Sequence, residues 1–104
     1  MPPTATPNLT LASDLNEKGN TSYRQGQYRE ALNYYQQALV IHREVGDRTA
    51  EGATLNSIGA VYRSLGQYDQ ALQNYQQALV IRREVGDKAS EETVVANIKS
   101  LPDN

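Results

Sequence analysis

The chain has 104 residues, enough for one domain, and 38% of them are hydrophobic, with seven tyrosines but neither phenylalanine nor tryptophan. Its formal net charge is −2 and no basic run exceeds two residues, so it lacks the positive footprint required for binding nucleic acid or an anionic membrane surface. The absence of cysteine excludes disulfides, thiolate nucleophiles and cysteine-based metal sites, and it is compatible with the cytoplasmic location that we predict.

The first eight residues, MPPTATPN, contain three prolines, and no basic residue precedes an apolar run. They therefore have the features of neither a signal peptide nor a membrane-spanning segment. We predict a disordered leader at residues 1–8, a folded domain at residues 9–101 and a short tail at residues 102–104. The first helix of the domain is expected at about Leu11–Arg24, before a turn at Gly26.

An internal repeat organises the rest of the chain. The phrase YQQALVIHREVGD, which begins at Tyr35, returns at Tyr75 with one residue changed. A shift of 40 residues superposes Gly26–Asp47 on Gly66–Asp87 with 17 of 22 positions identical. A fixed period of this length predicts a stack of repeats. The expected units are residues 9–46, residues 47–86 and a single capping helix at residues 87–101.

Each copy of the repeated stretch has the hydrophobic period of an α-helix. From Tyr28, small and apolar side chains recur at intervals of three and four residues, which places them along one helix face. Gly46 is expected to end this helix in the left-handed conformation, and Asp47 to cap the following helix. No alternating β-branched run or hairpin turn predicts a strand. The expected helices span about residues 11–24, 28–45, 48–65, 68–85 and 89–101.

The pattern resembles the tetratricopeptide repeat, a helix-turn-helix unit with small residues where paired helices touch and large residues between them. The matching positions are Leu15, Gly19, Tyr28, Ala31, Tyr35 and Ala38 in the first unit, and Leu55, Ile58, Gly59, Tyr62, Tyr68, Ala71, Tyr75 and Ala78 in the second. Glycine and alanine at these places allow close helix approach, while Tyr35 and Tyr75 fill the adjoining space.

The chain departs from the usual family pattern in three ways. Its period is 40 residues rather than 34, and Arg43 and Arg83 replace a frequent proline, features similar to a subgroup found in kinesin light chains, spindle-orientation adaptors and bacterial signalling proteins. Lys18 stands where an apolar residue is expected, as it can when one face of a terminal helix has no neighbour. The resemblance implies an all-α fold of antiparallel helix-turn-helix repeats, stacked as a short right-handed α-solenoid of about five helices.

Candidate catalytic residues are few. The single histidine, His42, has Arg82 at the equivalent position of the second copy, which argues against a tuned acid–base or a metal ligand and favours packing near a helix C-terminus. The repeated carboxylates, such as Asp47 and Glu51, lie near arginines and helix starts, where caps and ion pairs explain them. Phosphate-binding glycine motifs are absent. We therefore predict no enzyme activity, no cofactor and no metal site.

The resemblance implies that the first helix of each pair lines a concave face that binds a ligand. The candidate peptide-binding residues on this face are Asn16, Asn20, Tyr23, Asn56 and Arg63. Asn16 and Asn56 are equivalent and would form two steps of an amide ladder along a peptide backbone, or they only solvate an exposed helix face. Tyr23 and Arg63 would add an aromatic and a carboxylate contact.

The predicted function is a non-enzymatic protein–protein interaction module that binds a peptide or a partner protein. The alternative is a self-assembling module that forms homo-oligomers by end-to-end stacking or helix exchange, because two and a half repeats form a marginal stack. The chain is also compatible with a fragment of a longer signalling protein. Some members of the family grip a C-terminal carboxylate with lysines, but Asn16 and Thr93 occupy two of those places, which disfavours that mode.

Overall fold

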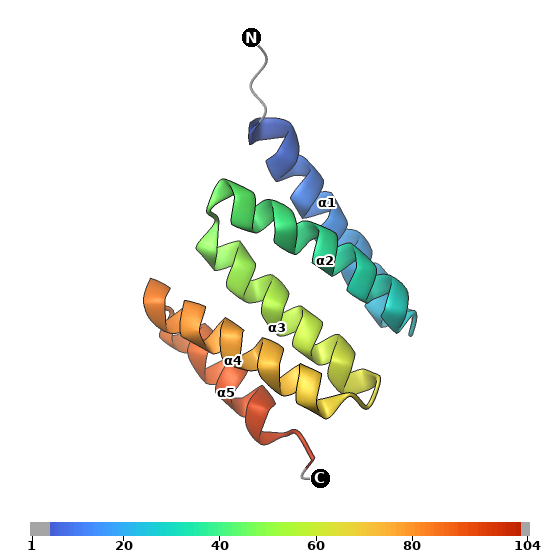
Figure 1. The fold of residues 1–104 in the computed structure, drawn as a ribbon, viewed down its shortest axis with the longest axis vertical. Helices are drawn as coiled ribbons and strands as arrows, with labels where there is room; N and C mark the ends of the chain where they lie inside the picture. Colours follow the sequence, from blue (N-terminus) through green and yellow to red (C-terminus); the bar gives the residue numbers. More distant parts are fainter. Residues whose placement is uncertain (1–4, 103–104) are drawn as a thin grey trace.

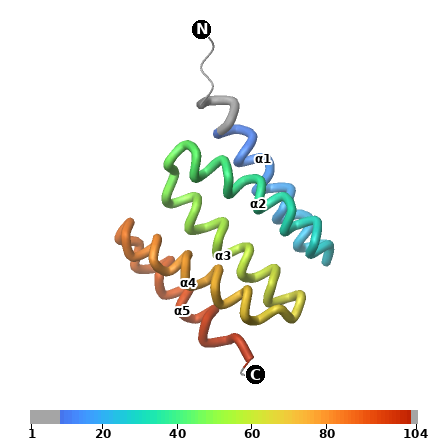
Figure 2. Tube along the Cα trace, viewed as in Figure 1, coloured from blue at the N-terminus to red at the C-terminus, as the bar shows by residue number. Residues whose placement is uncertain are grey.

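The structure, a computed structural model, describes residues 5–102 and contains five helices and no strand in that range. The helices are α1 (Ala5–Arg24), α2 (Tyr28–Val45), α3 (Arg48–Ser64), α4 (Tyr68–Val85) and α5 (Lys88–Lys99). Each helix packs against the next and runs back in the opposite direction, so that α1 to α5 form a row (Figure 1). Figure 2 shows the same path as a tight turn after each of the first four helices. The predicted all-α stack of helix-turn-helix repeats is confirmed.

The first helix is longer than the sequence predicted. It begins at Ala5 instead of near Leu11, so residues 5–8 of the expected disordered leader are helical, and that part of the prediction is wrong. Pro7 is compatible with this position, because the first turn of a helix has backbone N–H groups without intrahelical partners and proline lacks only that group. The remaining parts of the predicted leader and tail, residues 1–4 and 103–104, lie outside the described residues.

The helix ends follow the chemistry of single residues. Gly46 and Gly86 both adopt a left-handed conformation with a φ of 74°, which a residue without Cβ enters at little cost. Directly after them, the Asp47 carboxylate accepts a hydrogen bond from the Ala50 backbone N–H at 3.1 Å, and Asp87 accepts one from Ser90 at the same distance. The predicted helix stops and caps are therefore confirmed.

The core is built on the predicted repeat positions. The alanines at these positions, Ala31, Ala38, Ala71 and Ala78, are fully buried. The rings of Tyr35 and Tyr75 are buried as well, each against a glycine of the preceding helix. A Cβ atom added at Gly19 or Gly59 would lie 2.6 Å from the facing tyrosine ring, which explains why both positions lack a side chain. Tyr28 and Tyr68 are half-buried, and Tyr28 packs against the core from its rim.

None of the helices in residues 5–102 is both long enough and apolar enough to cross a membrane.

Candidate interaction face

Three helices that are not consecutive in sequence form one face of the molecule. Side chains of α1 and α3 meet where the Tyr23 hydroxyl lies 3.0 Å from the Ser64 hydroxyl, and α3 and α5 meet where Asn97 donates to Asn56 at 3.0 Å. We call this surface the α1–α3–α5 face. All five candidate peptide-binding residues belong to α1 or α3, the first helices of their units.

Asn16 has a role inside the fold. Its side-chain oxygen accepts a hydrogen bond from the Thr54 hydroxyl at 3.2 Å, and its amide nitrogen lies 3.0 Å from Nε2 of His42. The half-buried amide therefore joins α1, α2 and α3. Its equivalent Asn56 instead faces α5, where its oxygen accepts from Asn97. Asn16 and Asn56 are thus not two identical steps of an amide ladder. Hydrogen bonds within the chain already use both the oxygen and the nitrogen of the Asn16 amide.

A hollow of about 170 Å³ opens on the α1–α3–α5 face between α1 and α3. Its lining residues are Asn20, Tyr23, Tyr35, Ser57 and Ala60. The Tyr35 hydroxyl donates to the Asn20 side-chain oxygen, and the Tyr23 ring packs on Tyr28 with ring centroids 5.4 Å apart. Burial raises the pKa of Tyr35, while the neighbouring Ser57 hydroxyl partly offsets that effect, so the phenol stays protonated as a donor.

Sequence reasoning did not single out Ser57 and Tyr35 as lining residues. Tyr35 belongs to the second helix of its unit, and its ring reaches the α1–α3–α5 face only because Gly19 leaves room beside it. Ser57 precedes Ala60 by three residues, so helical periodicity was a usable signal for it.

The arginines fall into two groups. Arg43, Arg48, Arg82 and Arg83 each have a carboxylate oxygen within 4.0 Å. Among the described residues, Arg24, Arg29 and Arg63 have none, and Arg24 and Arg63 are exposed near the C-terminal ends of α1 and α3. Burial raises the pKa of both Tyr35 and Tyr75, and Arg24 and Arg63 respectively act in the opposite direction. Arg24 and Arg63 thus carry charges that no carboxylate of the described residues neutralises.

His42 is buried at its contact with Asn16. Its side chain is only 4% exposed, and Nε2 accepts from Asn16, so the proton of the neutral ring is on Nδ1, which has no partner among the described residues. Burial lowers the pKa of His42, with Asp47 and Glu51 acting in the opposite direction. The buried imidazole, bonded to the Asn16 amide, joins α2 to α1.

The repeated carboxylates hold the junctions between units. Glu51 is buried and accepts from Arg43 at 3.0 Å and from Arg48 at 2.9 Å, while its equivalent Glu91 accepts from Arg83 at 2.9 Å. No group of three or more histidine, aspartate or glutamate side chains in residues 5–102 is placed to hold a metal ion. The chemistry of these groups is therefore ion pairing between helices.

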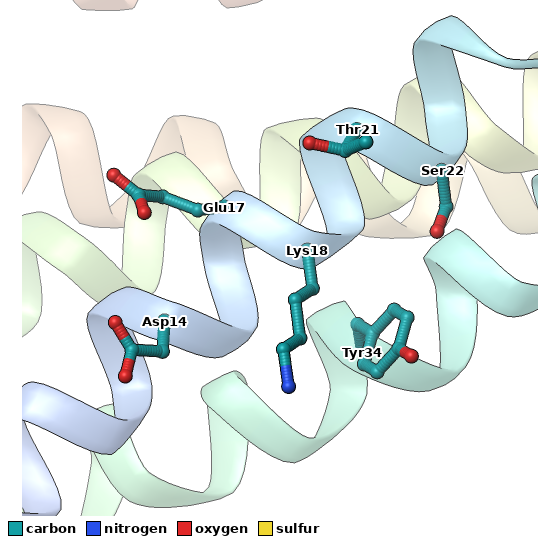
Figure 3. Close-up of a pocket in the computed structure, with 6 residues that line it drawn as sticks. All are labelled: Asp14, Glu17, Lys18, Thr21, Ser22 and Tyr34. Carbon is teal, nitrogen blue, oxygen red and sulfur yellow. The ribbon is translucent and has the colours of Figure 1, made fainter.

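A second hollow, of about 420 Å³, lies between α1 and α2 (Figure 3). In Figure 3, Lys18 of α1 extends toward Tyr34 of α2, and its Nζ lies 6.0 Å from the centroid of the ring. The other lining residues are Asp14, Glu17, Thr21 and Ser22. Ile58, the equivalent of Lys18, is buried, whereas Lys18 is exposed as the sequence led us to expect. This second hollow is mixed in charge and lies at the edge of the stack.

Comparison with known families agrees with this architecture. The family model described as tetratricopeptide repeat matches residues 9–84, which is most of the chain. The chain belongs to the tetratricopeptide repeat family. Repeats of this family generally mediate protein–protein interaction and are typically not enzymes. The match covers the repeat in general and does not confirm the 40-residue subgroup. No curated protein matches the chain closely enough to be counted as a relative.

Proposed function

We propose that this tetratricopeptide repeat chain is a non-enzymatic interaction module that binds an extended segment of a partner protein along the α1–α3–α5 face. The hollow between α1 and α3 is the observation that carries this proposal, because polar side chains line it and Arg24, which has no carboxylate within 4.0 Å among the described residues, lies in the depression next to it. A cytoplasmic setting is part of the proposal, since a chain without cysteine needs no oxidising compartment.

Each candidate residue receives a role from its contacts. Asn20 and Tyr23 line the hollow and would contact the ligand directly, and Arg63 would pair with a ligand carboxylate. Asn56 has one amide oxygen engaged by Asn97, which leaves its N–H groups for a peptide carbonyl. Asn16 would support the face from inside the fold, because its amide already bonds to α2 and α3.

The test uses the whole chain and a peptide selected against it from a displayed random library. Arg63→Ala is expected to weaken binding about tenfold, the loss of one charge-assisted hydrogen bond, and Asn56→Ala several-fold. Gln76→Ala, at an exposed position of α4 outside the face, serves as the control and should leave affinity unchanged. Melting temperatures should stay level in Arg63→Ala and Gln76→Ala, and should fall slightly in Asn56→Ala, which also loses the hydrogen bond from Asn97. Unchanged affinity in both face variants would retire the proposal.

Self-assembly is the second candidate function, and the open side of α5 favours it. Val95 is half-buried and, with exposed Ala96, lines a hollow of about 240 Å³, whereas its equivalent Leu55 is buried within the stack. A second copy could cover this surface by end-to-end stacking. Light scattering should then show a mass that rises with concentration and returns to that of one chain in Val95→Lys. A constant monomer mass at millimolar concentration would exclude this candidate.

A further inference from the structure

We propose that the open side of α5 is a dimer interface, on which a second copy of this chain packs its own α5 antiparallel about a two-fold axis. The inference rests on self-assembly, the second candidate function above, and specifies which surfaces meet. α5 is the last helix of the row and packs against α4 on one side (Figure 1). Of its 12 residues only Val94 is buried, whereas α3, which has neighbours on both sides, buries residues along its whole length.

Four side chains form a stripe along the open side of α5. They are Glu92, Val95, Ala96 and Lys99, and together with Glu91 they line the hollow of about 240 Å³ described above. Their spacing of three, four and seven residues places them on one face of the helix. We call these four residues the α5 stripe. The stripe has an apolar centre, with an anion at one end and a cation at the other.

The internal repeat shows that the α5 stripe is not built for a helix packed as closely as those inside the stack. The equivalents of Glu92 and Lys99 in α3 are Gly52 and Gly59. Both glycines are buried against α4, and a Cβ atom added at Gly59 would lie 2.6 Å from the Tyr75 ring. Two long charged side chains exclude such an approach. A helix that covers the α5 stripe must therefore lie farther away and offer charges of opposite sign.

The charges at the two ends of the α5 stripe have no partners among the described residues. Glu92 and Lys99 are both exposed, and neither has an opposite charge within 4.0 Å in residues 5–102. They cannot pair with each other, because seven residues of helix separate them by about 10.5 Å. Glu91, the other anion of the hollow, already pairs with Arg83 at 2.9 Å. The stripe is thus left with one unpaired anion and one unpaired cation.

A second α5 matches both charges at once. In an antiparallel pair with the two-fold axis between Val95 and Ala96, Glu92 of each copy faces Lys99 of the other. Val95 of each copy then faces Ala96 of the other, so the apolar centres meet. Such an interface is self-complementary, which closes the assembly at two chains. Because each chain contributes one helix of 12 residues, we expect a weak dimer with a dissociation constant of roughly 0.1–1 mM.

The experiment exchanges the charges of the α5 stripe and measures the mass by analytical ultracentrifugation from about 0.05 to 2 mM protein. The unchanged chain should approach the mass of two chains and no more. Glu92→Lys and Lys99→Glu each place like charges opposite one another twice, so each variant alone should dimerise at least tenfold more weakly. The double variant, and an equimolar mixture of the two single variants, should recover dimerisation because both arrangements restore opposite charges. Glu44→Lys, a charge reversal at an exposed position on α2, is the control and should change nothing.

The outcomes separate this interface from self-assembly in general. If the mass rises beyond two chains, the copies stack in an open series, so self-assembly stands and the two-fold pair of α5 helices is refuted. The pair is also refuted if either single variant dimerises as strongly as the unchanged chain, or if the mixture of the two stays monomeric while the unchanged chain dimerises. A constant monomer mass of the unchanged chain would exclude both the pair and the self-assembly candidate.

Discussion

The two repeat units share a backbone and differ in the polar contacts buried inside it. In the first unit, neutral His42 bonds to Asn16 and joins α1 to α2. In the second unit, an Asp87 oxygen lies 3.8 Å from the guanidinium of the equivalent Arg82. Each of these buried residues has one nitrogen without a partner in the described chain. The same scaffold thus accepts an amide–imidazole contact or an ion pair at one place, because the surrounding apolar packing determines the helix positions.

The largest loss of stability is expected at the glycine–tyrosine contact that both units share. Gly19→Ala and Gly59→Ala would each place a Cβ atom 2.6 Å from a buried tyrosine ring, and overpacking of this kind costs about 2–3 kcal/mol of unfolding free energy. Urea denaturation measures it. Gly52→Ala is the matched control, since its Cβ would meet Ile81 at 3.0 Å and the better helix propensity of alanine offsets the crowding. Equal stability of all three variants would contradict the packing argument.

A smaller effect should separate the two junctions between units. Glu51 is 6% exposed and accepts from two arginines, whereas Glu91 is less buried and accepts from one. Glu51→Gln removes a buried carboxylate that two half-exposed arginines contact and should cost about 1–2 kcal/mol. Glu91→Gln, largely screened by solvent, should cost less than 1 kcal/mol. Thermal unfolding monitored by circular dichroism compares them, and a larger loss for Glu91→Gln would reverse the assigned order.

The smallest effect concerns pH and should be confined to the first unit. Burial lowers the pKa of His42 below its ordinary value of 6.5, so the unfolded chain binds this proton more tightly than the folded chain. The free energy of unfolding should therefore decrease as the pH falls through about 6.5 toward 5.

Urea denaturation at pH 7, 6 and 5 gives this slope, and His42→Gln should flatten it. The pH range of the His42 effect lies above the range in which Asp87 affects stability. Hydrogen bonds from Ser90 lower the pKa of Asp87 from 3.8, so the stability that Asp87 contributes is lost only at more acidic pH. An unchanged slope in His42→Gln would show that another group is responsible.

Much of the fold could be predicted because its determinants are local or repeated. Gly46 and Asp47 define a helix stop and a cap through their own backbone and side-chain chemistry, and the structure confirms both. The start of α1 was predicted six residues too late, because proline was interpreted as disorder although the first helical turn accepts it. A proline there carries no local signal that separates these two outcomes.

The candidate interaction face was only partly predictable. Helical period predicted that Asn20 and Tyr23 share one face of their helix, and both line the hollow. The same period could not show that Asn16 bonds to His42 and Thr54, because those partners are 26 and 38 residues away. Partner choice for a polar side chain depends on which helices meet, and that is a tertiary property.

By itself, the sequence determined the helices, their stops and caps, and the places where glycine and alanine let helices approach. These follow from backbone conformation and from a repeated apolar stripe, both of which act over a few residues. Only the tertiary structure decided that Ser57 turns back to its own helix while Asn97 crosses to the next, leaving the hollow on one side of α3. The physical reason is that hydrogen bonding between helices depends on the length and reach of side chains at contacts that no local pattern encodes.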